Sequence, residues 1–293
     1  MTFTKPRIGA LDLAIGALLV LAAGYVVYRV RIQLNYHWEW SALPQFIVRF
    51  DEASGRWVPN YLLKGLLTTI RLSIWVTLLA LVLGTLAGLA QVSRRLLYRL
   101  LGRTYVELVR NLPPLVLIFI FYYFLSDQIM PLLRVDRLMD CCPGATRSMM
   151  TLLLAPPEQF ANFCSALVTL ALFEGAYIAE IVRGGIESVE KGQWEASAAL
   201  GFSRVQRMRY ILLPQALRRI LPPLAGQFIS TIKDSAIVSV ISIQELTFQG
   251  MDLMASTYLN FEIWITVALF YLCLTLPCSL GVARLERALA RRS

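Results

Sequence analysis

The chain has little charge and a single histidine, His37. Only 16% of its 293 residues are charged, whereas 57% are hydrophobic. This composition lies outside the range of soluble domains and within that of polytopic membrane proteins. The net charge of +9 comes mainly from arginines beside apolar runs, and orientation in a membrane explains these better than nucleic acid binding does.

The chain also lacks a nucleotide-binding loop. A P-loop needs a Gly-Lys-Ser/Thr sequence to hold phosphates. None of the four lysines stands between a glycine and a serine or threonine, these being Lys5, Lys64, Lys191 and Lys233. The chain is therefore not itself an ATPase, and no nucleophile, base and orienting group stand out together as a catalytic site.

Five cysteines are present without the spacing of a zinc site. Cys164, Cys273 and Cys278 lie in apolar runs, and Cys141 and Cys142 are adjacent in a polar loop. We expect a packing role for cysteines in this chain. Oxidation of the loop pair stays open if that loop lies outside the cytoplasm.

Long apolar runs dominate the rest of the sequence. A membrane helix needs about 20 mostly apolar residues, and six stretches qualify: Leu11–Tyr28, Leu62–Ala90, Tyr105–Leu125, Phe160–Val182, Leu224–Ile243 and Phe261–Val282. We predict an all-α polytopic membrane protein with about six transmembrane helices. Residues 1–60 form an N-terminal helix with an external segment, and residues 61–293 form a transmembrane domain.

The distribution of lysine and arginine predicts the orientation. Six spans put both termini on one side, and the loops of that side hold sixteen lysines and arginines against seven in the others. Positive residues accumulate on the cytoplasmic side of a membrane. We therefore expect both termini and the segment 187–222 to be cytoplasmic, and residues 29–60 and 126–159 to face outward.

One span contains the sequence GTLAG from Gly84 to Gly88. Small residues at this spacing allow two membrane helices to approach closely. A glycine-rich helix with no special contact is the alternative, and the sequence does not distinguish the two.

The segment 187–222 is polar although spans flank it. It predicts a helix over Glu187–Leu200, stopped by Gly201, and a second helix over Ser203–Leu213, with Ser203 as its N-cap. Pro214 then ends or kinks the second helix. The alternative is an interfacial helix whose arginines hold anionic lipid.

This segment resembles the EAA loop of ABC importer permeases, which is written EAA, three residues, G, nine residues, I, x, L, P. The matching positions are Glu195, Ala196, Gly201 and Ile211–Pro214, together with small residues that include Ala199; Ser197 stands where the third motif position is usually alanine. Four further blocks, Tyr105–Phe124, Gly175–Ala196, Leu213–Ile229 and Ile232–Leu246, are similar to the polar amino acid permeases of that superfamily.

The resemblance implies a type I (MetI-like) permease fold in a bacterial inner membrane. It implies import of a polar or charged amino acid from the periplasm, driven by a separate cytoplasmic ATPase dimer that carries the ATP and magnesium; this chain would need no cofactor of its own. It further implies a periplasmic binding protein and a second permease, identical or related. Coupling to the ATPase would fall to Glu195, Ala196, Ser197, Ala199, Gly201 and Pro214.

Charged side chains within spans are costly, at least about 2.5–3.5 kcal/mol at the helix centre, and are functional candidates by default. Glu174, Lys233 and Asp234 lie about ten residues from the cytoplasmic ends of their spans, or about 15 Å deep. Glu174 is expected to hold the substrate's amino group or a basic side chain, with Tyr177 beside it. Lys233 and Asp234 fall in a block shared with the polar amino acid permeases, which favours a gate or helix-packing role over substrate selection. Ser235, in the same block, completes the pathway set.

Each of these assignments has an alternative. Glu174 can instead pair with Lys233 as a buried structural pair. Glu180 is expected mainly to pair with Arg183, and Glu107 to pair with Arg110 or reach the interface. At the level of function, a membrane-embedded enzyme using the midplane carboxylates and a passive channel remain alternatives to the importer. The sequence does not specify which amino acid is carried.

Overall fold

The computed structural model describes residues 9–33, 36–53, 55–132, 134–135 and 143–290, and divides the chain into two compact units, Met1–Trp40 and Ser41–Ser293. The first unit contains one long helix, α1 (Ala10–Gln33), whose described leucines are exposed. Its apolar part, Ala10–Tyr25, is shorter than the other candidate spans. The predicted span Leu11–Tyr28 is thus present as a helix but is the weakest candidate for crossing a membrane.

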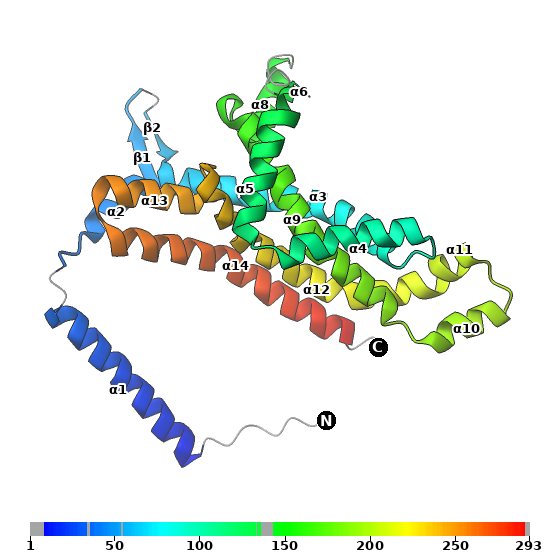
Figure 1. Cartoon of the computed structure of the whole chain (residues 1–293). Coiled ribbons are helices and arrows are strands. Elements are labelled where there is room, and N and C mark those ends of the chain that lie inside the picture. The colour runs from blue at the N-terminus through cyan, green and yellow to red at the C-terminus, as the bar shows by residue number, and fades with distance from the viewer. Residues whose placement is uncertain (1–8, 34–35, 54, 133, 136–142, 291–293) are drawn as a thin grey trace. The chain divides into compact units, whose positions relative to one another are not determined.

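Four helical runs of the described residues are long and apolar enough to cross a membrane. These are α3 (Tyr61–Gln91), the run Pro157–Glu187 containing α9 (Phe160–Glu187), the run Arg207–Ile241 containing α12 (Leu213–Asp234), and α14 (Asn260–Ala290) over Asn260–Ala288. Each overlaps one of the predicted spans. They pack side by side in the second unit (Figure 1).

The span predicted over Tyr105–Leu125 is not one straight helix. It consists of α4 (Leu96–Asn111) and α5 (Pro114–Phe124), which meet at 117°. The break falls at Leu112 and Pro113, both extended, because a residue that precedes proline is driven out of the helical region. If the bent pair counts as one span, the described residues contain five.

The centre of the second unit is the contact between α3 and α9. Two thirds of the apolar window of α9 is buried, 67%, against 11% for α14, so α9 is the inner helix and α14 an outer one. Gly84 and Gly88 both face α9, where a Cβ at Gly88 would come within 2.8 Å of Ala179 O and Val182 Cβ. The close approach predicted from the GTLAG sequence is confirmed.

The segments between the spans contain structure that the sequence did not predict. Before α3, the short helix α2 (Leu43–Ile47) leads into an antiparallel hairpin of β1 (Val48–Asp51) and β2 (Arg56–Pro59). After α5, a short π-helical segment, Leu125–Ile129, continues into α6 (Met130–Leu132).

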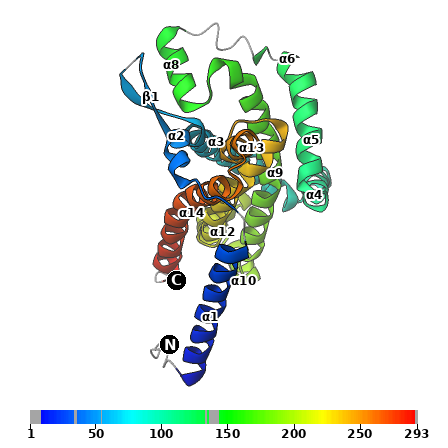
Figure 2. The same cartoon turned by 90° about the vertical axis from the view of Figure 1, so that its left-hand side faces the viewer.

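The loop before α9 also holds a helix, α8 (Gly144–Leu153). Cys141 and Cys142 lie outside the described residues, so their state stays a prediction. The hairpin and α8 lie at the opposite end of the second unit from α10 (Lys191–Ala199) and α11 (Arg204–Gln206), as both views show (Figures 1 and 2).

Candidate functional site

A buried carboxylate, Glu174, lies between α9 and α12. Its side chain is fully buried, and its Oε2 accepts a hydrogen bond of 2.7 Å from Gln227 Nε2 on α12. Its Oε1 is also buried and has no hydrogen-bond partner among the described residues. The carboxyl group of Asp234, also on α12, is near enough to interact with it. The site thus brings two acidic groups together with one amide donor.

The structure does not pair Glu174 with Lys233. The Lys233 side chain is exposed, and no ion pair among the described residues joins it to Glu174. Consecutive residues of a helix point about 100° apart, so Asp234 can face α9 while Lys233 does not. The next residue, Ser235, is buried and donates to Ile232 O, which occupies its hydroxyl within its own helix.

Glu180 joins α9 to α4 through a network of charges. It accepts two hydrogen bonds from Arg183, at 3.0 and 2.8 Å, which confirms the predicted i,i+3 pair. It also lies 3.2 Å from Arg110 Nη1 on α4. Arg183 in turn pairs with Glu187. The arrangement holds the C-terminal end of α9 against α4.

Two neighbours of this network differ from the sequence-based expectation. The predicted pair of Glu107 and Arg110 is wrong, because Glu107 Oε2 accepts from Asn111 Nδ2 at 2.8 Å and Arg110 reaches Glu180 instead. The Tyr177 ring lies under the Arg110 guanidinium, 5.8 Å from its centroid. Tyr177 therefore faces α4, and its role beside Glu174 stays a prediction.

The polar segment 187–222, here called the coupling segment, begins with a break in the helix. The predicted helix over Glu187–Leu200 is instead the end of α9 at Glu187 followed by α10. Ser188 donates to Gly185 O, and Arg219 of α12 donates to Ser188 O. Those bonds hold the chain at the end of α9, while the extended backbone of Glu190 starts α10 in a new direction.

The turn after α10 follows the predicted chemistry. Gly201 has φ of +78°, a conformation that favours glycine and ends helices. Ser203 and Gln206 then form a capping box: Ser203 Oγ accepts from Gln206 N at 3.3 Å, and Gln206 Oε1 accepts from Ser203 N at 2.8 Å. The prediction of Ser203 as N-cap is confirmed.

Pro214 does not end the second helix. The chain passes from α11 through a wide-turn (π-helical) stretch, Arg207–Leu212, directly into α12. Proline is tolerated in the first turn of a helix, and Pro214 occupies this position in α12. The coupling segment is thus continuous with a candidate membrane span, Arg207–Ile241.

The last turn of α10 exposes mainly small side chains, and Leu200, directly after it, is also exposed. Glu195, Ala196, Ala198 and Ala199 are exposed, whereas Ser197 is buried and donates to Trp194 O at 3.0 Å. A partner could therefore approach the backbone closely here. Ser197 points inward, away from that surface.

A second buried carboxylate, Glu245, was missed in the sequence. It caps α13 (Leu246–Thr257) by accepting from Phe248 N at 2.8 Å and Thr247 N at 2.9 Å. It also accepts from Tyr271 of α14 and Thr69 of α3. Burial raises the pKa of Glu245 to about 7 against these donors. An acidic residue just before an apolar helix was the signal that could have found it.

The comparisons agree with the motif and the fold. The family of inner membrane components of binding-protein-dependent transport systems matches residues 80–293. The chain belongs to this family. It is therefore a membrane subunit of a transporter and not an enzyme, which sets aside the membrane-enzyme alternative.

Two curated relatives and one solved structure narrow the comparison. The glutamine transport system permease protein GlnP of Escherichia coli (strain K12) is 37% identical over 221 residues, 74% of this chain and 89% of the relative. The probable glutamine ABC transporter permease protein GlnM of Bacillus subtilis (strain 168) is 38% identical over 191 residues, 65% and 76% of the two chains.

The solved structure is the crystal structure of an amino acid ABC transporter with histidines. It shares 31% identity with this chain at a TM-score of 0.62, and the match covers 78% of this chain and 94% of the other. The predicted type I permease fold is confirmed for the second unit.

Proposed function

We propose that this chain imports a polar amino acid as the membrane subunit of an ATP-driven transporter. Relatives named for glutamine transport support the substrate class, since they match at 37% and 38% identity over most of their length. The ATP and magnesium belong to a separate ATPase pair, because the chain has no P-loop. A periplasmic amino-acid-binding protein delivers the substrate.

The observation that carries the substrate site is the pair of facing acidic side chains, Glu174 and Asp234, where Glu174 Oε1 is buried without a donor at hydrogen-bonding distance among the described residues. A buried carboxylate oxygen without a donor is costly, and the α-ammonium of an amino acid supplies both the donor and the opposite charge. Asp234, on the facing helix, adds a second acidic group. We assign the pathway to Glu174 and Asp234, with Lys233 and Ser235 on the same helix end and Glu180 and Tyr177 nearer the coupling segment.

The coupling site is the exposed end of α10 with its turn. Glu195, Ala196, Ala199 and Gly201 offer a compact surface for a groove in the ATPase, and Ser197 and Pro214 set the inner face and the start of α12. The coupling segment and both termini face the cytoplasm, as the excess of arginine on these loops supports. The hairpin and α8 lie at the opposite end of the second unit (Figure 2), and we assign this end to contact with the binding protein.

The exposed outer face of the bundle is consistent with contact to a second permease, either a copy of this chain or a related one. Only 11% of the apolar window of α14 and 33% of that of the run containing α12 is buried. These faces lie open to lipid or to a partner subunit. Two subunits related by symmetry would place two copies of the coupling segment under one ATPase pair.

The substrate site is tested with Glu174→Gln in the assembled transporter. Gln keeps the size but removes the charge, so we expect loss of uptake and of substrate-stimulated ATP hydrolysis, while the permease still binds its ATPase. The matched control is Glu158→Gln, an exposed carboxylate before α9. Normal uptake by a stably expressed Glu174→Gln protein would refute the pathway role.

Docking of the ATPase is tested separately by co-purification. Glu195→Lys and Gly201→Asp should release the ATPase, because the first reverses a charge and the second strains a left-handed backbone position. Glu286→Lys, exposed on α14, should leave the complex intact. A passive channel, the remaining rival, would show uptake and no dependence on Glu195.

A further inference from the structure

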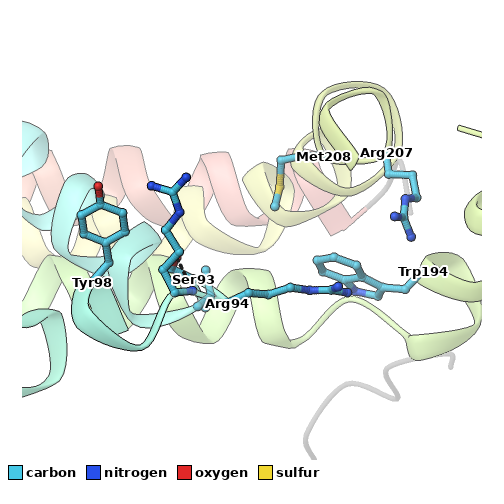
Figure 3. A pocket seen from close by; sticks show the side chains of 8 residues that line it. Ser93, Arg94, Tyr98, Trp194, Arg207 and Met208 are labelled. Atoms are coloured by element: carbon cyan, nitrogen blue, oxygen red, sulfur yellow. Dashed lines mark hydrogen bonds between the residues drawn. The ribbon is translucent and has the colours of Figure 1, made fainter. Parts of the chain in front are cut away.

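A cavity of about 360 Å³ lies between the α3–α4 turn and the coupling segment. Its lining comes from Val92, Ser93, Arg94, Arg95 and Tyr98 on one side and from Trp194, Arg207 and Met208 on the other. Figure 3 shows Arg94 extending from the turn toward Trp194, and Arg207 pointing toward it from the coupling segment. Neither the proposed substrate site nor the proposed ATPase-docking surface gives this cavity a role.

The cavity is strongly cationic. Three of its lining residues are arginines, and an adjoining hollow of about 550 Å³ adds Arg99, Arg103 and Lys191. The first cavity has no acidic residue in its lining, and the acidic residue that lines the second, Glu187, is already paired with Arg183. The charge of this region is thus not neutralised by the described residues that line it.

Arg207 adds a more specific observation. Its Nε is buried and has no hydrogen-bond partner among the described residues. A guanidinium donor that is desolvated without an acceptor is costly, and guanidinium groups match phosphate oxygens in geometry. The lining of the cavity therefore lacks an anionic acceptor at this point.

The surroundings of the cavity indicate the source of that anion. The first turns of α4, directly after Arg94 and Arg95, expose four leucines by 51–65%: Leu96, Leu97, Leu100 and Leu101. The arginines and leucines alternate over one short stretch of helix. Apolar side chains next to arginines at the end of a membrane helix suit acyl chains below a phosphate.

We propose that this cavity binds the phosphate of an anionic lipid headgroup, with Arg94, Arg95 and Arg207 as its ligands and the leucines of α4 against the acyl chains. The lipid then bridges the α3–α4 turn to the coupling segment. The inference goes beyond import and ATPase docking, and needs only that this end of the helices lies at a bilayer surface.

The experiment is native mass spectrometry of the transporter, purified with its ATPase from lipid nanodiscs of phosphatidylcholine with or without phosphatidylglycerol. The wild-type complex should retain phosphatidylglycerol selectively. Arg94→Gln and Arg207→Gln should each reduce retention about fivefold, since each removes about 1 kcal/mol of attraction to an anionic headgroup. Arg94→Lys keeps the charge and should retain most of the lipid, and Arg284→Gln, at the exposed end of α14, should behave as wild type.

Three outcomes would overturn the proposal. Equal retention in all variants would mean that the cavity holds no lipid. Loss of the ATPase from Arg94→Gln and Arg207→Gln with unchanged lipid retention would assign the cavity to an acidic side chain of the ATPase. Displacement of phosphatidylglycerol by millimolar inorganic phosphate, or equal stabilisation by phosphate in pure phosphatidylcholine, would make free phosphate the ligand.

Discussion

Gly84 of α3 lies directly against Ile178 of α9. A Cβ built on Gly84 would come within 2.6 Å of Ile178 Cβ and within 2.7 Å of Gly175 O. Neither of those atoms can move aside without moving the backbone of α9. The close contact between α3 and α9 therefore depends on a residue with no side chain.

Replacing Gly84 by alanine should destabilise the subunit. Overpacking of this kind costs about 1–3 kcal/mol, and we expect a lower melting temperature in detergent and less folded protein in the membrane. The matched control is Gly184→Ala on α9, where a Cβ would meet nothing within 4 Å and where alanine is favoured over glycine by up to about 1 kcal/mol. If the Gly84→Ala and Gly184→Ala proteins have the same melting temperature, the close contact between α3 and α9 does not exist.

The link between Glu180 and Arg110 should be measurable as a coupling between two mutations. Glu180→Gln removes an acceptor shared by Arg110 and Arg183. Because these side chains are partly exposed, we expect the free energy of unfolding to fall by about 0.5–1 kcal/mol, or the melting temperature by roughly 1–4 °C. The effects of Glu180→Gln and Arg110→Gln should be less than additive.

The control for this coupling is Glu107, which bonds Asn111 instead of Arg110. The effects of Glu107→Gln and Arg110→Gln should simply add. Coupling of Glu107 with Arg110, and none of Glu180 with Arg110, would restore the pairing expected from sequence spacing.

Serine at position 197 should be neutral for ATPase docking. Its hydroxyl bonds Trp194 O within its own helix and points away from the exposed surface of α10, so Ser197→Ala should leave ATPase co-purification unchanged. Ser197→Leu forces a larger side chain into a buried position, which destabilises the fold by about 1–3 kcal/mol. We expect this variant to weaken ATPase docking by distorting α10. An effect of Ser197→Ala on docking would mean that the hydroxyl reaches the partner.

Glu245 should make the stability of the subunit depend on pH. Burial raises its pKa to about 7 from 4.5, so the folded protein binds this proton more tightly than the unfolded chain. The contribution is therefore fully present below about pH 4.5 and is lost as pH rises through 7. We expect the melting temperature to fall over this window, and Glu245→Gln to remove that part of the slope.

The same substitution separates the charge of Glu245 from its hydrogen bonds. The amide of glutamine cannot accept at both ends, so Glu245→Gln also weakens the cap of α13 at all pH values. Asp252→Asn, exposed on the same helix, is the control. An identical slope in wild type and Glu245→Gln would exclude Glu245 as the titrating group.

Local patterns in the sequence predicted the parts of the structure that depend on local physics. Apolar run length located α3, α9, α12 and α14, and turn chemistry located Gly201 and the cap at Ser203. The break between α4 and α5 was also encoded locally, at Pro113 and Pro114, but the apolar run masked it. The length and hydropathy of a run do not indicate whether its helix is straight or bent. The bend between α4 and α5 is therefore seen only in the structure.

Side-chain partners across helices were not predictable in the same way. Spacing along one helix correctly paired Glu180 with Arg183, and wrongly paired Glu107 with Arg110, because the rotation of α4 against α9 decides which carboxylate Arg110 meets. The choice of Gln227 over Lys233 as partner of Glu174 likewise depends on the face that α12 turns toward α9. The network of Glu245 joins α13 and α14 to α3, whose Thr69 lies 176 residues before Glu245 in the sequence.

The π-helical stretch Arg207–Leu212 joins α11 of the coupling segment to the membrane helix α12 as one continuous helical run. Pro214 lies within this run, and α12 also contains Pro222 and Pro223. Arg204 and Asp234 are separated by about 45 Å of helix at 1.5 Å per residue. Gln227 and Asp234, the neighbours of Glu174, lie in the C-terminal half of this helical run. If the ATPase docks at the coupling segment as proposed, a tilt of this run would also shift the amide donor and the acidic group that face Glu174.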